Sequence, residues 1–192
     1  KEASKLVTTG ANPARTYGHQ VQGLPPSRVE SWRISNAKGM SIAISACKTT
    51  AFEFKQKVKD PGIEAKVEQA RFWEELWSDA GADLRERCRE AWKMLDYSSD
   101  LTAWRQSAGP MAATKIEFSK LGWRPKKPDE VRSSEGELWT FGAGRNRHME
   151  DLLRIQAAQE LWEHASHHYG GQGLEKGGDL SAAKRLHLKL LR

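Results

Sequence analysis

The chain has 192 residues, with 31 Lys and Arg against 25 Asp and Glu, and its formal charge is +6. At roughly 150 residues per domain, this length predicts one domain or two small ones, and the eight Trp argue against a disordered chain. The longest nearly apolar stretch, residues 39–47, is far shorter than the roughly 20 residues needed to cross a bilayer, which argues against a membrane protein.

The positive charge is concentrated towards the amino-terminal end. Residues 1–60 hold ten basic and four acidic side chains, whereas residues 61–110 hold seven basic and ten acidic ones. A basic region beside an acidic helical region is typical of a protein that binds a polyanion at one end. The alternative is an ordinary protein of high isoelectric point, in which the lysines form a solvated face.

The first predicted helix begins after Pro25 and carries an apolar stripe that includes Trp32. Ser27 and Glu30 have the spacing of a capping box at its start. Trp32 on such a stripe is interpreted as a core residue rather than a base-stacking one. Further on, residues 49–59 alternate apolar and charged side chains, which favours a short strand.

Two further helices are predicted between residues 60 and 95. The first begins with Asp60 as the cap and Pro61 in the first turn, and the second follows Gly81. Their short connection favours an antiparallel pair. The apolar stripe of the first helix consists of Ile63, Val67, Ala70, Trp73 and Trp77.

Another helix is predicted to start at Gly109-Pro110 and to end at Gly122, where a Schellman cap would press Trp123 onto Phe118. Residues 124–137 are predicted to be a linker, because they contain two prolines and a single apolar residue. Residues 138–141 favour a short strand.

The last part of the chain is predicted to be helical. Asn146 is expected to cap a long helix, a glycine-rich loop follows at 170–178, and a final helix starts near residue 179. The predicted fold is therefore mostly α, a helical bundle or two small helical subdomains with at most short strands. We expect a helical region at 1–123 with a basic amino-terminal lobe, the linker at 124–137, and a helical connector at 138–192.

Residues 6–23 read LVTTGANPARTYGHQVQG. The order of Thr-Gly, Asn-Pro, Tyr-Gly and the final Gly resembles the segment after the polymerase palm in the reverse transcriptases of non-LTR (LINE-type) retroelements. The resemblance continues at scattered positions along the chain, among them Gly39, Asp60-Pro61, Trp73, Trp77, Gly109-Pro110, Leu121-Gly122-Trp123 and Gly178-Asp179.

The resemblance implies a thumb and connector that grip a template–primer duplex of RNA and DNA, next to the polymerase palm of the same chain. It implies no catalysis by this part of the chain. Two-metal phosphoryl transfer needs converging carboxylates, and this chain has neither a Tyr-x-Asp-Asp turn nor any Asp-Asp pair. We therefore expect no enzyme activity and no cofactor here, while the parent polymerase would use Mg²⁺ ions.

The candidate nucleic-acid-binding residues are basic side chains, which neutralise phosphates without selecting a sequence. In the amino-terminal lobe they are Arg15, Arg28, Arg33, Lys38, Lys48, Lys55, Lys57 and Lys59. Further along, Arg145 and Arg147 follow a Gly-Ala-Gly turn, where they and free helix amides are expected to hold one backbone phosphate.

Two alternatives remain open at this point. Glu160, His164 and His168 have a helical spacing that permits a metal site, although histidines at the end of a helix also favour its dipole. A helical protein–protein module would instead use an exposed groove formed by Trp73, Trp77, Trp92 and Trp104. The two cysteines lack metal or disulfide spacing, which favours an intracellular, reducing compartment.

Overall fold

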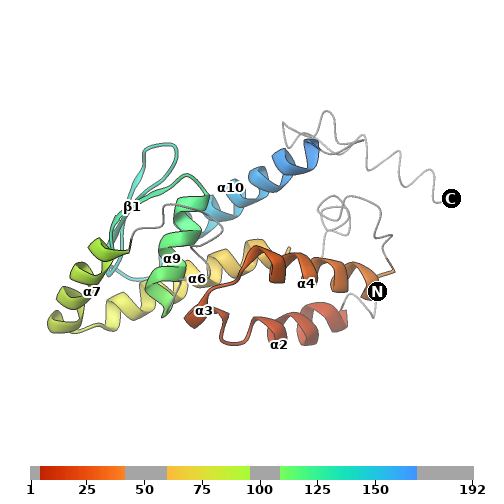
Figure 1. Cartoon of the computed structure of the whole chain (residues 1–192), viewed down its shortest axis with the longest axis horizontal. Coiled ribbons are helices and arrows are strands. Elements are labelled where there is room, and N and C mark those ends of the chain that lie inside the picture. Colours follow the sequence, from red (N-terminus) through yellow and green to blue (C-terminus); the bar gives the residue numbers. More distant parts are fainter. Residues whose placement is uncertain (1–4, 42–59, 96–108, 168–192) are drawn as a thin grey trace.

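The computed structural model describes residues 5–41, 60–95 and 109–167 of the chain (Figure 1). Several predictions lie outside these ranges: the strand at 49–59, the glycine-rich loop at 170–178 and the final helix. Lys48, Lys55, Lys57, Lys59 and Trp104 also lie outside them.

The described part is mostly helical, as predicted, with one small antiparallel sheet. Its helical elements are η1 (Val7–Ala11), α2 (Asn12–Thr16), α3 (His19–Gln22), α4 (Pro26–Gly39), α6 (Pro61–Asp79), α7 (Ala82–Met94), α9 (Gly109–Lys120) and α10 (Arg147–Ser166). The strands are β1 (Arg124–Lys127), β2 (Glu130–Arg132) and β3 (Leu138–Thr140), in the sheet order β1-β2-β3.

Helix α6 is the central element of the fold. In Figure 1, α10 and the sheet lie above it, α2 and α3 lie below it, and α4 lies next to its amino-terminal end. Its predicted start is confirmed, since the Asp60 carboxylate accepts hydrogen bonds from the amides of Gly62 (2.9 Å) and Ile63 (3.0 Å). The cap fixes where the helix begins and so sets which of its residues face each neighbour.

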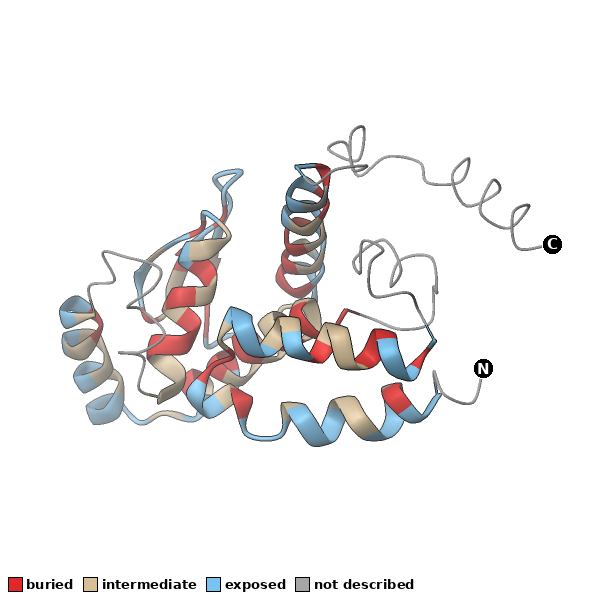
Figure 2. Ribbon diagram, turned by 45° about the vertical axis from the view of Figure 1, so that its right-hand side comes forward, coloured by how far each residue is buried: buried red, intermediate tan, exposed pale blue. Residues whose placement is uncertain are grey.

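The main core is built around aromatic side chains from several elements. Trp73 of α6 stacks with Trp92 of α7 at a centroid distance of 6.3 Å, and Phe118 of α9 stacks with Trp123 at 5.4 Å. Trp73 Nε1 donates to the backbone oxygen of Pro128 at 2.7 Å, so the indole is both packed and hydrogen bonded. Figure 2 shows the buried residues on the sides of the helices that face one another.

The end of α9 is the predicted Schellman cap. Gly122 has a left-handed φ of +72°, and the Trp123 amide donates to the Phe118 oxygen at 3.0 Å. Glycine tolerates this φ without steric cost. The turn brings the Trp123 ring onto Phe118, and both side chains are buried.

The prediction of a linker at 124–137 is wrong. These residues form the β1–β2 hairpin, and Val131 of β2 is completely buried in the main core. The prolines are compatible with a sheet here because Pro125 lies in the edge strand β1 and Pro128 lies in the turn. A single apolar residue suffices because only one face of this small sheet packs on the core.

The described part of 138–192 is not a separate helical connector. Met149 and Leu153 of α10 belong to the same core cluster as Val67 and Trp73 of α6. Because one continuous core joins the two helices, the described residues form one packed body rather than two subdomains.

The start of α4 differs in detail from the prediction. The helix begins at Pro26, and its N-cap is Pro25, so Ser27 lies inside the first turn and makes no capping hydrogen bond. Trp32 is buried as predicted and packs with Leu24 and Ala65 in a second, smaller cluster between α4 and α6.

Candidate nucleic-acid interface

The structure places the predicted basic residues of the amino-terminal region in different environments. Arg15, Arg28 and Lys38 are exposed. Arg33 is not available as a phosphate ligand, because its guanidinium donates twice to the Asp60 carboxylate, both times at 2.8 Å, and its side chain is only 14% exposed. Arg33 therefore holds α4 on the start of α6.

Helix α4 does not present its three cations on one face. Arg28, Arg33 and Lys38 follow each other at intervals of five residues. At 3.6 residues per turn, each interval rotates the side chain by about 140° around the helix. The described part of the predicted basic lobe therefore does not form a continuous basic surface.

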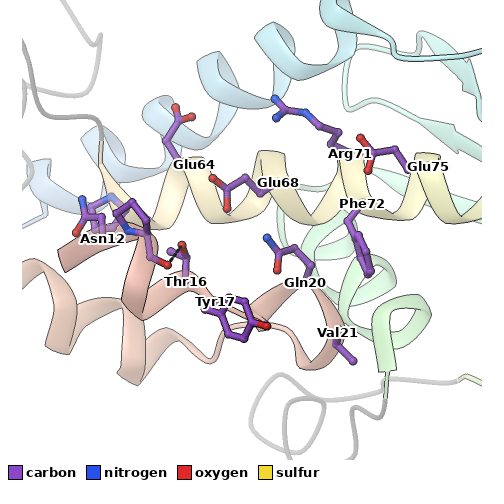
Figure 3. Close-up of a pocket in the computed structure, with 13 residues that line it drawn as sticks. Asn12, Thr16, Tyr17, Gln20, Val21, Glu64, Glu68, Arg71, Phe72 and Glu75 are labelled. Carbon is purple, nitrogen blue, oxygen red and sulfur yellow. Dashed lines mark hydrogen bonds between the residues drawn. The ribbon is translucent and has the colours of Figure 1, made fainter. Parts of the chain in front are cut away.

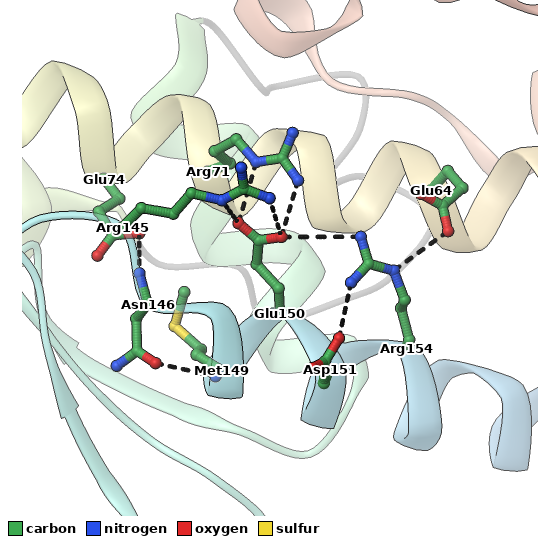
Figure 4. Close-up of polar contacts among 9 residues, drawn as sticks. All are labelled: Glu64, Arg71, Glu74, Arg145, Asn146, Met149, Glu150, Asp151 and Arg154. Carbon is green, nitrogen blue, oxygen red and sulfur yellow. Dashed lines mark hydrogen bonds and ion pairs between the residues drawn. The ribbon is translucent and has the colours of Figure 1, made fainter.

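The predicted phosphate site at Arg145 is occupied by carboxylates of the protein itself (Figure 4). Arg145 Nε and Nη2 donate to Glu150 Oε1 (2.6 Å) and Oε2 (2.8 Å). Asn146 caps α10 as predicted, because its side-chain Oδ1 accepts a hydrogen bond from the backbone amide of Met149 at 3.1 Å. The backbone amide of Asn146 donates to the Glu74 carboxylate at 3.2 Å. Arg147 is exposed, but the start of α10 is already neutralised by Glu74 and Glu150.

Glu150 is the centre of an ion-pair cluster that joins α6, the 141–146 loop and α10. Arg71 of α6 adds two more hydrogen bonds, at 3.0 and 2.8 Å, and Arg154 Nη2 lies 3.7 Å from Oε2. Hydrogen bonds from Arg145, and then from Arg71, lower the pKa of the buried Glu150 to about 2. We interpret this cluster as structural, because Arg71 and Arg145 each donate two hydrogen bonds to the one Glu150 carboxylate (Figure 4).

Glu74 is a close neighbour of Glu150, but its pKa is shifted in the opposite direction. Burial raises the pKa of Glu74, and the nearby charges of Glu150 and Glu75 act in the same direction. Its Oε2 accepts the Asn146 amide, while its buried Oε1 has no hydrogen-bond partner among the described residues. Glu74 therefore fixes the loop before α10 at an electrostatic cost.

The two strands of the β1–β2 hairpin carry exposed basic residues that were not among the predicted sites. We call Arg124, Lys126, Lys127 and Arg132 the basic face; all four are exposed. Arg124 and Arg132 are directly opposite each other in the antiparallel pair, on the face away from the buried Val131. Like charges in this position destabilise a sheet.

The basic face forms one ion pair within the described residues, although Asp129, Glu130, Glu135 and Glu137 belong to the same segment of the chain. Lys127 Nζ lies 3.1 Å from Glu130, but no ion pair to Arg124, Lys126 or Arg132 is formed within residues 5–41, 60–95 and 109–167. Arg132 Nη1 donates to the Gly136 oxygen at 2.7 Å, which orients it without neutralising it. The sequence contains one signal for this hairpin, a Lys-Pro-Asp turn that is flanked by charged residues and followed by one apolar residue.

Of the four tryptophans in the protein–protein alternative, the three that the structure describes do not form an exposed groove. Trp73, Trp77 and Trp92 are only 3–4% exposed and belong to the main core. Two cations cover Trp77, since the guanidinium carbons of Arg85 and Arg89 lie 5.7 and 5.6 Å from its ring centroid. These side chains therefore stabilise the fold and offer no surface to a partner helix.

Among the described residues, no group of three His, Cys, Asp or Glu is arranged to hold a metal ion, and His168 of the predicted triplet lies outside them. In the same part of the chain, every helix is too short or too polar to span a bilayer.

Comparison with known proteins gives no relative of this chain. No family model, no curated protein and no solved structure matches it. Its function is therefore inferred from its own residues and their geometry.

Proposed function

We propose that the basic face binds the sugar–phosphate backbone of a template–primer duplex. In this proposal the chain is a non-catalytic part of a retroelement reverse transcriptase-like protein and holds nucleic acid for a polymerase palm. The observation that supports backbone binding is the placement of Arg124 directly opposite Arg132 on an exposed strand pair. The retroelement class is supported by the resemblance of residues 6–23 and the scattered positions that follow.

An anion would relieve the repulsion between the two arginines. Guanidinium groups offer several fixed donors that match phosphate oxygens, and lysines such as Lys126 and Lys127 add point charges beside them. Contacts of this kind release counterions and position a duplex without selecting its sequence. Arg15, Arg28 and Lys38, although dispersed, add to the long-range attraction of the same polyanion.

Fluorescence anisotropy with a labelled RNA–DNA hybrid tests this proposal. We expect Arg124→Glu/Arg132→Glu to weaken binding by roughly tenfold or more, because two contacts become repulsive. The matched control is Arg28→Glu/Lys38→Glu on α4, which changes the net charge by the same amount and is expected to weaken binding only about threefold through the long-range field.

Equal losses in the two variants would contradict the proposal, since binding would then depend on net charge and not on the basic face. Far-UV circular dichroism of both variants verifies that the comparison is between folded proteins. No binding by the unaltered chain at low salt would also overturn it.

A further inference from the structure

A groove of about 970 Å³ runs along the side of α6 that faces α2 and α3 (Figure 3). We call it the acidic groove. The residues that matter here are Glu64, Glu68, Phe72 and Glu75 of α6, with Tyr17 and Val21 on the opposite wall. The four α6 residues share one helix face because they follow each other at intervals of three or four.

The groove carries negative charge that the surrounding cations only partly balance. Glu64 accepts from Arg154 at 3.2 Å, and Glu68 lies 3.6 Å from His19. Arg71 also lines the groove, but its guanidinium is bound to Glu150. Glu75 is exposed and forms no ion pair within the described ranges. Glu68 and Glu75 therefore give the groove an acidic character.

The opposite wall carries two exposed apolar side chains beside the polar Asn12, Thr16 and Gln20. Tyr17 is 92% exposed and Val21 is 48% exposed, and both lie across the groove from Phe72. Exposed aromatic side chains beside charged groups are typical of protein interfaces, where Tyr and Arg supply much of the binding energy.

The basic face has the complementary pattern. Leu138 of β3 is directly opposite Arg132, so Arg124, Arg132 and Leu138 form one cross-strand row on the outer side of the sheet. Leu138 is 48% exposed. The row thus offers two cations and an apolar side chain, which complement the carboxylates of the groove and its exposed Tyr17 and Val21.

We propose that the acidic groove binds the basic face of a second copy of this chain. The two surfaces belong to different elements, since the groove is lined by α6 with residues 12–21 and the basic face lies on β1 and β2. The contact is therefore head-to-tail, and each copy keeps one free basic face and one free groove for further association. Arg124 and Arg132 approach Glu68 and Glu75, while Leu138 packs against Tyr17 and Val21.

This contact does not depend on nucleic-acid binding, although it uses the same basic face. If both occur, a duplex and the groove of a second copy compete for Arg124 and Arg132. Nucleic acid then dissociates the assembly, and the assembly protects the basic face when no duplex is present.

Sedimentation velocity of the 192-residue chain, without nucleic acid, tests the proposal. At about 0.05 M salt we expect the weight-average sedimentation coefficient to rise with protein concentration, and at about 0.5 M salt we expect it to return to the monomer value. Both Glu68→Gln/Glu75→Gln and Arg124→Gln/Arg132→Gln are expected to be monomeric at low salt. The matched control, Glu86→Gln/Glu90→Gln on the exposed side of α7, is expected to associate as the unaltered chain does.

Mixing the two monomeric variants gives the sharpest result. One retains the basic face and the other retains the groove, so the mixture is expected to form a dimer that cannot grow further. A monomeric unaltered chain at low salt, association that survives the Glu68 and Glu75 changes, or a mixture without dimer would each overturn the proposal. Nucleic-acid binding by Glu68→Gln/Glu75→Gln separates this failure from that of the proposed function.

Discussion

At the scale of single residues, the most constrained group is the Glu150 carboxylate. It is 1% exposed and accepts two hydrogen bonds from Arg71 and two from Arg145. A buried carboxylate is tolerated when it is paired and fully hydrogen bonded, and removing one partner leaves uncompensated charge. Glu150 therefore governs how α10 and its preceding loop are fixed to α6.

We expect Glu150→Gln to lower the free energy of unfolding by about 2 kcal/mol at neutral pH. This is below the range for breaking a fully buried pair, because the arginines remain partly solvated. Chemical denaturation measures the change. Asp151→Asn is the control on the same helix: Asp151 is 68% exposed and pairs only with Arg154 among the described residues, so its loss is expected to cost less than about 1 kcal/mol.

The difference in stability between the unaltered chain and Glu150→Gln depends on pH. The pKa of Glu150 is about 2 in the folded chain and about 4.3 in an unfolded one. Because the folded value is the lower one, the carboxylate stabilises the fold fully above the unfolded pKa, and this contribution is lost as the pH falls towards 2. The stability difference between the unaltered chain and Glu150→Gln is expected to shrink over that interval; a constant difference would contradict the ion-pair account.

At the scale of elements, the contact between α4 and α6 depends on a glycine. A Cβ added at Gly62 would lie 2.6 Å from Val29 Cγ1 and 2.9 Å from Arg33 Nη2. These atoms belong to the side chains that hold α4 against the start of α6. Only a residue without a side chain permits the two helices to approach this closely.

We expect Gly62→Ala to destabilise the fold by about 1–3 kcal/mol, since α4 must move or its side chains must leave their rotamers. Thermal unfolding measures the effect. Gly39→Ala is the control within α4, because its new Cβ would meet only Val7 Cγ2, at an ordinary 3.6 Å; a change within about 0.5 kcal/mol is expected there. Similar effects at both positions would refute the close-approach argument.

Local signals predicted one end each of α6, α9 and α10, but they did not predict the helical elements at 7–22, and they misplaced the cap of α4. The Asp60 cap, the Gly122 turn with Trp123 on Phe118, and the Asn146 cap all depend on residues within a few positions of each other, and all three are confirmed. The hairpin at 124–132 was missed because its prolines and charges are equally typical of a linker. Its strand character comes from tertiary contacts, such as the hydrogen bond from Trp92 Nε1 to the Pro125 oxygen.

The candidate site was harder to predict from the sequence than the helices were. The pairing of Arg33 with Asp60 joins positions 27 residues apart, and that of Arg71 with Glu150 joins positions 79 apart. No local sequence pattern indicates such contacts. From the sequence alone, an arginine that is paired within the fold cannot be distinguished from one that is exposed and free to bind a phosphate. The opposition of Arg124 and Arg132 depends on the strand register, which only the folded hairpin defines.

At the scale of the whole molecule, the net charge of +6 conceals two surfaces of opposite sign. The basic face lies on the sheet side of α6, and the acidic groove lies on the side of α2 and α3 (Figure 1). A polyanion that approaches this molecule is attracted to the sheet side and repelled from the groove. Under the proposed function, the orientation of a bound duplex would follow from the position of the sheet.

The salt dependence of duplex DNA binding tests the basic face most directly. Each phosphate contact adds about 0.9 to the slope of log K against log salt concentration, so Arg124→Gln/Arg132→Gln is expected to reduce that slope by about 1.8. Arg28→Gln/Lys38→Gln, with the same loss of charge on α4, is expected to change it much less. An unchanged slope in the Arg124 and Arg132 variant would show that the basic face does not contact the phosphodiester backbone.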